Sequence, residues 1–278
     1  MLRNIPSEVW AFDVEWVPDI ASGRRAYDLA PDVDDHAVLD EMWNRGGATE
    51  DEPRPYLKTV LCRVVSVAAV IRKRAQHGDV SLVLHSLPAA DAESSDEADL
   101  LSCFLEAVGK AKPQLVGFNS RSADLMILLQ RAMVHRLALP DFCQRPAKPW
   151  DGVDYFARGS DAHIDLKEEF SGWGRATPSL HEFATACRIP GKIATDGRHV
   201  VDLWLDGDLR RIVQYNECDA LSTYLLWLRA ALLGGHLSPE EHERDEQQLE
   251  ALLTSRGAMA GNDHLGTYLA AWASLRAR

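Results

Sequence analysis

One short segment near the start of the chain constrains the fold more than any other. Residues Val9 to Val17 form an apolar run in which Asp13 and Glu15 are the only charges. Such a run is typical of a β-strand, and side chains two residues apart point to the same side of a strand. Asp13 and Glu15 therefore share one face. Two like charges so placed repel each other unless something positive binds them, and the alternative is an edge strand whose acids stay hydrated.

The second feature is an acid at a strand-to-helix junction. Residues Gln114 to Phe118 read as a buried strand, and the next four residues, Asn-Ser-Arg-Ser, read as a polar turn. From Asp124 on, apolar residues recur at helical spacing. An aspartate in the first turn of a helix offsets the helix dipole and caps free amides. Taken alone, Asp124 is therefore typical of a capping residue.

The third feature is a tyrosine and an aspartate on a predicted long helix. The segment from Asp208 to Leu233 contains no glycine or proline. Tyr215 and Asp219 are four residues apart, so they lie on the same face of this helix. Asp219 is close to the apolar stripe, which is unusual for an unpaired acid. Taken alone, Tyr215 is typical of a core tyrosine whose hydroxyl reaches the rim.

Taken together and in this order, the three features resemble the DEDD superfamily of 3'-5' exonucleases, tyrosine subclass. Further segments resemble the predicted bacterial exonucleases related to the proofreading domain of family-B DNA polymerases. The resemblance covers roughly residues 8–232. The further segments lie between the second and third features and are His163-Ile-Asp-Leu166, Ser179-Leu-His-Glu-Phe183 and Ile189-Pro-Gly-Lys192.

The resemblance implies an α/β fold of the ribonuclease H-like (DnaQ-like) type. Its five-stranded mixed sheet would be flanked by helices, with the site at the edge of the central strand. We expect an exonuclease domain at residues 1–235, including an acidic insertion at about 18–56, and a C-terminal helical extension at 236–278. The helices of the extension lie outside the resemblance, and they either pack on the core or form a homodimer interface.

The resemblance also implies two divalent cations as cofactors. Asp13, Glu15, Asp124 and Asp219 would hold them, with Asp13 contacting both. Hard oxygen ligands suit Mg²⁺ or Mn²⁺, and the sequence has no set of histidines and cysteines that indicates zinc.

Three further residues acquire roles from the resemblance. Tyr215 would orient the attacking water, because a phenol with an ordinary pKa of about 10 is a poor base at neutral pH. Asn119 would contact the terminal nucleotide. Trp16 follows the acidic pair directly, and it either stacks on the last base or fills the core.

The chain departs from the family pattern at one position and selects a subclass at another. The residue before Asp124 is Ala123, where the pattern has an aromatic residue, so we expect looser packing there. The histidine subclass has its base five residues before the final aspartate, and here that residue is Gln214. We expect His163 to be a hydrogen-bonded loop histidine rather than a general base.

The net charge of −12 is the main fact against a nucleic-acid enzyme, because proteins that track a duplex have a basic face. Much of the excess lies in segments 32–52, 91–99 and 240–250, which read as solvated. An enzyme that grips a few nucleotides of a single-stranded end can be acidic overall. The candidates for a basic groove are Lys58, Arg63, Arg121, Lys167, Arg175 and Lys192.

The remaining composition is that of an ordinary globular protein, with 46% hydrophobic and 26% charged residues. No stretch approaches the length of a membrane span, and the start of the sequence lacks a signal-peptide pattern. The five cysteines are scattered, and this odd number without metal-ligand spacing favours a reducing cytoplasm.

The periodicity predicts the other elements. Strands are expected at residues 59–72 and 80–87, and helices at 37–43, 96–111, 179–187 and 239–256, with a final helix that ends at Leu275. Ser179 and Glu182 are spaced for a capping box. Residues 137–159 read as loop-rich.

The function predicted from these features is a metal-dependent 3'-5' exonuclease that releases nucleoside 5'-monophosphates from the 3' ends of single-stranded DNA or RNA. Two alternatives stay open at this point. One is a phosphodiesterase for dinucleotides or very short oligonucleotides, and the other is a non-catalytic nucleic-acid-binding module that kept the fold. No residue type in the sequence distinguishes DNA from RNA.

Overall fold

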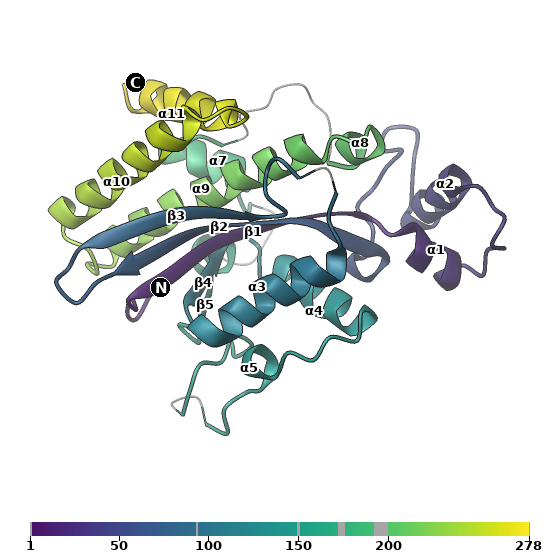
Figure 1. Ribbon diagram of the computed structural model, residues 1–278, viewed down its shortest axis with the longest axis horizontal. Helices are drawn as coiled ribbons and strands as arrows, with labels where there is room; N and C mark the ends of the chain where they lie inside the picture. Colours follow the sequence, from purple (N-terminus) through teal and green to yellow (C-terminus); the bar gives the residue numbers. More distant parts are fainter. Residues whose placement is uncertain (1, 93, 149–150, 172–175, 192–199, 278) are drawn as a thin grey trace.

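A five-stranded mixed sheet forms the centre of the protein (Figure 1). The structure is a computed structural model, and it describes residues 2–92, 94–148, 151–171, 176–191 and 200–277. The strands are β1 (Glu8–Pro18), β2 (Cys62–Arg74), β3 (Val80–Leu87), β4 (Gln114–Gly117) and β5 (His163–Asp165). Their order in the sheet is β3-β2-β1-β4-β5. This is the predicted ribonuclease H-like α/β arrangement, and β1 with its two acids is the central strand.

The central strand joins two kinds of pairing. β1 is antiparallel to β2, which is antiparallel to β3, while β4 and β5 are parallel to β1. Alternation along β1 separates two apolar layers, because successive side chains point to opposite faces. Val9 and Ala11 belong to one core cluster, and Phe12 and Val14 to the other.

Helices cover both faces of the sheet (Figure 1). One face packs on α3 (Glu97–Ala111), α4 (Asp124–Val134) and the short α5 (Pro140–Cys143). The other packs on α9 (Leu209–Leu233), which is buried along most of its length. Beside α9 lie α7 (Leu180–Ala186) and, after β5, α6 (Leu166–Ser171). The predicted capping box at Ser179 and Glu182 is present at the start of α7.

The acidic insertion forms a helical hairpin beyond the carboxyl end of β1 (Figure 1). It contains α1 (Ile20–Ala26), which periodicity did not predict, and α2 (Asp35–Gly46), which includes the predicted 37–43 helix. Arg54 in the segment after α2 pairs with Asp202 of α8 (Val200–Leu205). The second strand starts later than expected, because Thr59–Leu61 form the 3-10 helix η1 instead.

The C-terminal helices α10 (Pro239–Gly257) and α11 (Asp263–Arg276) pack on α9 and share its apolar cluster. Two buried polar contacts fix them. Arg72 Nε of β2 lies 2.8 Å from Asp245 Oδ2 of α10, and both side chains are almost fully buried. His264 Nε2 of α11 lies 2.7 Å from Glu217 Oε2 of α9. The expected boundary near residue 235 falls in the turn between α9 and α10, and a homodimer through these helices stays a prediction.

Within the described part of the chain, no helix is both long and apolar enough to cross a membrane.

Candidate active site

Three of the predicted acids converge on the face of the sheet that packs against α9. Asp13 and Glu15 lie on β1, and Asp219 comes from α9. One carboxylate oxygen from each lies within 4.8 Å of the others, and all three residues are half-buried. The residues opposite the two strand acids on β2 are small: Ala68 faces Asp13, and Ser66 faces Glu15. Small side chains there leave space beside the carboxylates.

The local backbone is irregular next to these acids. The register of β1 against β2 shifts between Glu15 and Trp16, because Ser66 pairs with Glu15 but Val64 pairs with Trp16. This leaves Val65 as an extra residue in β2, which is a β-bulge. Bulges bend a strand and re-aim its side chains, and they are frequent beside active sites.

Asp124 reaches the same strand from α4, which packs on the opposite face of the sheet from α9. Among the described residues, β4 pairs with β1 only from Val9 to Ala11. Farther along β1, the carboxylate of Asp124 accepts a hydrogen bond from the backbone N–H of Val14, and it also accepts one from its own N–H. Asp124 is therefore the first residue of α4, as predicted, but its carboxylate is turned onto β1.

Burial and neighbouring acids raise the pKa values of Asp13 and Asp124. Burial raises the pKa of Asp13 well above its usual range, and the charges of Asp124, Asp219 and Glu15 raise it further. Burial raises the pKa of Asp124 to about 7, and the charges of Asp165 and Asp219 act in the same direction. Such a site resists carrying its full negative charge unless a cation enters.

Tyr215 lies over the same cluster. Its hydroxyl is hydrogen-bonded to the carboxylate of Asp219, one helical turn away on α9. Burial raises the pKa of Tyr215 far above its ordinary value, and the charges of Asp219, Glu15 and Asp13 raise it further. The phenol is therefore protonated at neutral pH. It can donate a hydrogen bond, but it cannot act as a free base.

Asn119 lies in the turn between β4 and α4, with a positive φ of 67°. Its backbone N–H donates to Asp165 Oδ1 over 2.9 Å. Its side-chain oxygen accepts hydrogen bonds from Ser122 Oγ and from Lys167 Nζ. Asparagine tolerates the left-handed region better than most residues, because its side chain can bond locally.

Asp165 organises this turn, and the sequence alone did not identify it as a functional residue. The buried carboxylate accepts backbone N–H bonds from Asn119, Arg121 and Lys167 at 2.9, 2.9 and 3.0 Å. The only signal for it in the sequence was its place in the His-Ile-Asp-Leu segment. Several N–H donors identify a carboxylate that holds a loop in place.

Comparison with known proteins identifies the family of this chain. The profile of a family described as "Predicted 3'-5' exonuclease related to the exonuclease domain of PolB" matches residues 54–272. The chain belongs to this family. The resemblance inferred from the sequence is thereby confirmed, while membership of the tyrosine subclass stays a prediction. Among curated proteins, none matches the sequence significantly.

A family-B DNA polymerase from the hyperthermophilic archaeon Pyrobaculum calidifontis is among the similar solved structures. The identity is 18% and the TM-score 0.45; the alignment covers 94% of this chain and 27% of the polymerase chain. The present chain thus spans about a quarter of the polymerase's length.

The family match corrects one expectation about extent. The C-terminal helices were expected to lie outside the resemblance, but the match continues through α10 and into α11. The match begins after β1, so it contains Asp124, Tyr215 and Asp219 but neither Asp13 nor Glu15. The two strand acids lie beside Asp219 in the fold, and their place in an exonuclease site stays a prediction.

Two residues that the family pattern made candidates for a base, Gln214 and His163, have other contacts in the structure. Gln214 donates its amide to the carbonyl of Gly261, so its side chain is engaged with the α10–α11 turn. His163 is a fully buried residue of β5 rather than a loop histidine, so that detail was wrong; its Nε2 is 2.9 Å from Ser120 Oγ, as the hydrogen-bonded alternative required. Burial lowers the pKa of His163 to about 3, and the charge of Arg121 lowers it further.

Trp16 lies away from the acids. It is half-buried and packs against the core cluster of α3 and α4, on the opposite face of β1 from the side chains of Asp13 and Glu15. The alternation of side chains in a strand already indicates this face. Core packing is thus the observed contact, and base stacking by Trp16 stays a prediction.

The predicted basic residues within the described ranges do not all lie at the same turn. Arg63 covers the ring of Trp204, and Arg121 pairs with Glu168 at 2.9 Å. Lys58 is exposed beside η1, whereas Lys167 lies at the turn that contains Asn119. Arg175 and Lys192 lie outside the described residues.

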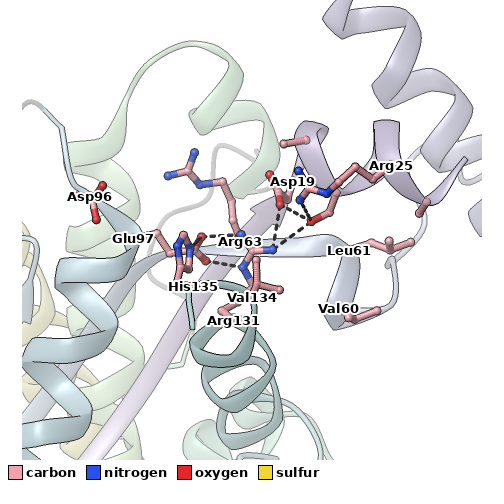
Figure 2. A pocket seen from close by; sticks show the side chains of 13 residues that line it. Asp19, Arg25, Val60, Leu61, Arg63, Asp96, Glu97, Arg131, Val134 and His135 are labelled. Atoms are coloured by element: carbon pink, nitrogen blue, oxygen red, sulfur yellow. Dashed lines mark hydrogen bonds and ion pairs between the residues drawn. The ribbon is translucent and has the colours of Figure 1, made fainter. Parts of the chain in front are cut away.

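A cavity of about 760 Å³ lies apart from the acids, past the carboxyl end of β1 (Figure 2). Arg131 of α4 is buried there between Asp19 and Glu97, with N–O distances of 2.9 and 2.6 Å. Glu97 also accepts the backbone N–H of Val64. None of the predicted catalytic or metal-binding residues lines this cavity, although Arg63, a predicted basic residue, does. Its buried charges are paired with one another, so it is a structural network.

Proposed function

We propose that this protein is a metal-dependent 3'-5' exonuclease of the tyrosine subclass. It would hydrolyse phosphodiesters at the 3' end of single-stranded DNA or RNA and release nucleoside 5'-monophosphates. The observation that carries the proposal is the convergence of Asp13, Glu15 and Asp219 within 4.8 Å, with the Asp124 carboxylate bonded to the same strand. Membership of the exonuclease family supports the reaction class.

The donor set fits divalent cations. Four carboxylates approach one another in a partly buried site, and their mutual repulsion favours a ligand of high positive charge. Oxygen donors of this kind suit Mg²⁺ or Mn²⁺. Asp13 would contact both cations, Glu15 and Asp219 one of them, and Asp124 the other. When bound, such a pair supplies charge stabilisation for an in-line displacement at the scissile phosphate.

Tyr215 would hold the attacking water. Its hydroxyl stays protonated because burial and the neighbouring acids raise its pKa, and it is anchored to Asp219. A protonated phenol at this position fixes the orientation of a water by hydrogen bonding and takes no proton from it. Asn119 would contact the terminal nucleotide from the turn that precedes Asp124.

The charge of the chain supports a short single-stranded substrate. With a net charge of −12, a long polyanion is repelled by most of the surface. The proposed enzyme therefore grips a few nucleotides and binds them weakly and with strong salt dependence.

Digestion of 5'-labelled single-stranded DNA and RNA tests the proposal, with Mg²⁺ or Mn²⁺ and with EDTA. Wild type is compared with Asp13→Ala, and Glu106→Ala, which removes an exposed acid of α3, is the matched control. We expect a ladder that shortens from the 3' end for wild type and the control, and none for Asp13→Ala or with EDTA.

Other results would point elsewhere. Cleavage of dinucleotides without cleavage of longer strands would favour the short-substrate phosphodiesterase. Absence of all cleavage, together with nucleic-acid binding, would favour a binding module. Products with 3' phosphates would contradict the proposed attack.

A further inference from the structure

One lysine lies beside the proposed site without a carboxylate partner. Lys167 is the second residue of α6, directly after the segment that ends β5. Its backbone N–H donates to Asp165 Oδ1, which fixes the start of the side chain. Its Nζ lies 3.3 Å from the side-chain oxygen of Asn119. The lysine head is thus directed to the turn that leads into Asp124.

Several other cations are held by carboxylates, in contrast to Lys167. Arg121, in the same turn, is held by the carboxylate of Glu168 and by the carbonyl of His163. Lys73 and Lys110 are paired with Glu8 and Glu106. Across the described ranges, Lys167 forms no ion pair, and its contact is a neutral amide. Its charge therefore remains available to an anion.

The side-chain amide of Asn119 provides a second hydrogen-bond donor beside Lys167. Its oxygen already accepts from Lys167 and from Ser122, so its NH₂ group is directed away from both donors. The backbone of this residue is fixed in the left-handed region by the bond to Asp165. One ammonium and one amide donor thus lie together, next to a cluster of acids that would hold the scissile phosphate through cations.

We propose that Lys167 Nζ, held beside the Asn119 amide that faces the terminal nucleotide, binds a backbone phosphate of the substrate strand other than the scissile one. This inference rests on the proposed function. A lysine is a compact point charge that binds a phosphate oxygen without demanding one orientation. The contact gives an acidic enzyme a local attraction for the strand, and it makes a strand with more than one phosphate a better substrate than a single ester.

The salt dependence of binding tests the contact without requiring cleavage. A labelled single-stranded oligonucleotide is titrated by fluorescence anisotropy over a range of NaCl, with Ca²⁺ present and intact DNA verified on a gel. Lys167→Gln is compared with wild type, with the charge-preserving Lys167→Arg and with Lys110→Gln, which removes a remote lysine.

Loss of one phosphate contact on a single strand should reduce the slope of log K against log salt by about 0.7. We expect this for Lys167→Gln alone, together with roughly tenfold weaker binding at low salt. A slope for Lys167→Gln equal to that of Lys110→Gln would overturn the inference, as would a wild type that binds no single strand.

Kinetics separates this contact from a general loss of structure. The p-nitrophenyl ester of thymidine 5'-monophosphate contains only the scissile phosphate. In Lys167→Gln, we expect KM for an oligonucleotide to rise while kcat and the rate on the small ester stay near wild type. Equal losses on both substrates would overturn the phosphate contact. If wild type binds but cuts neither substrate, the proposed function fails, and the salt slopes still decide the role of Lys167.

Discussion

Two groups of carboxylates near β1 differ in what neutralises them, because one lies on the strand itself and the other includes Asp19, the residue that follows it. Asp13 faces Asp124, Asp219 and Glu15, and burial and these charges raise its pKa. For Asp19, burial acts in the same direction, but the hydroxyl of Ser22 and the charge of Arg131 outweigh it and lower the pKa. An aspartate near β1 thus belongs either to a cluster of acids, as Asp13 does, or to an ion-pair network, as Asp19 does.

The difference teaches how to separate a structural charge network from a ligand site. Around Arg131, the chain supplies its own countercharge from three elements, and the network holds α4 to α3 and to the end of β1. Around Asp13, the chain gathers charges of one sign and a protonated tyrosine. A buried group of like charges costs stability unless a cation is bound, so such a group is typical of function.

The largest expected effect on stability comes from the Arg131 network. Replacement Arg131→Met leaves Glu97 and Asp19 buried without their countercharge, so we expect a loss of about 3–5 kcal/mol in the free energy of unfolding. Urea denaturation measures it. Lys110→Met is the matched control on the surface, and an equally small effect of both replacements would show that the network is not structural.

Divalent cations should stabilise the protein by binding the acids around Asp13. Mn²⁺ or Mg²⁺ at about one hundred times its dissociation constant should stabilise the folded state by roughly 2.7 kcal/mol. Asp13→Asn should lose this gain, and Arg131→Met should keep it in full. Thermal melts with and without metal measure both. A gain that survives in Asp13→Asn would place the cation elsewhere.

The pH dependence of the metal-free protein should also follow from the acids. Asp124 has a pKa of about 7 in the folded protein and about 4 in an unfolded chain. Between these values the folded state keeps a proton that the unfolded state has lost, so stability falls as the pH rises through this window. Asp124→Asn should weaken this fall, as urea titrations across the window in EDTA would show. An unchanged pH profile would contradict the assignment.

The smallest expected effect belongs to Tyr215. Because its hydroxyl stays protonated, Tyr215→Phe removes a hydrogen bond and no base. We expect kcat to fall by about tenfold, less than the hundredfold or more that is typical of lost proton transfer. The stabilisation by metal should be retained, since no ligand is removed. A fall of several thousandfold would instead assign a proton-transfer role to the tyrosine.

Much of the site could be predicted because local rules govern it. Alternation along β1 places Asp13 and Glu15 on one face, and the helical repeat places Tyr215 over Asp219. The same alternation indicates that Trp16 points the other way, as the structure has it. The role of Asp124 could not be assigned from its own segment, since nothing there distinguishes a capping aspartate from one that reaches a neighbouring strand.

The sequence by itself therefore determined the first four strands, the long helix and the chemical nature of the site, since periodicity and residue type are properties of short segments. Only the tertiary structure decided which distant groups meet. The bond from Val14 to Asp124, the turn held by Asp165 and the ion pairs of Arg131 join residues far apart in the chain. Their partners depend on how the sheet and helices pack, because the energy of a buried charge is set by its surroundings.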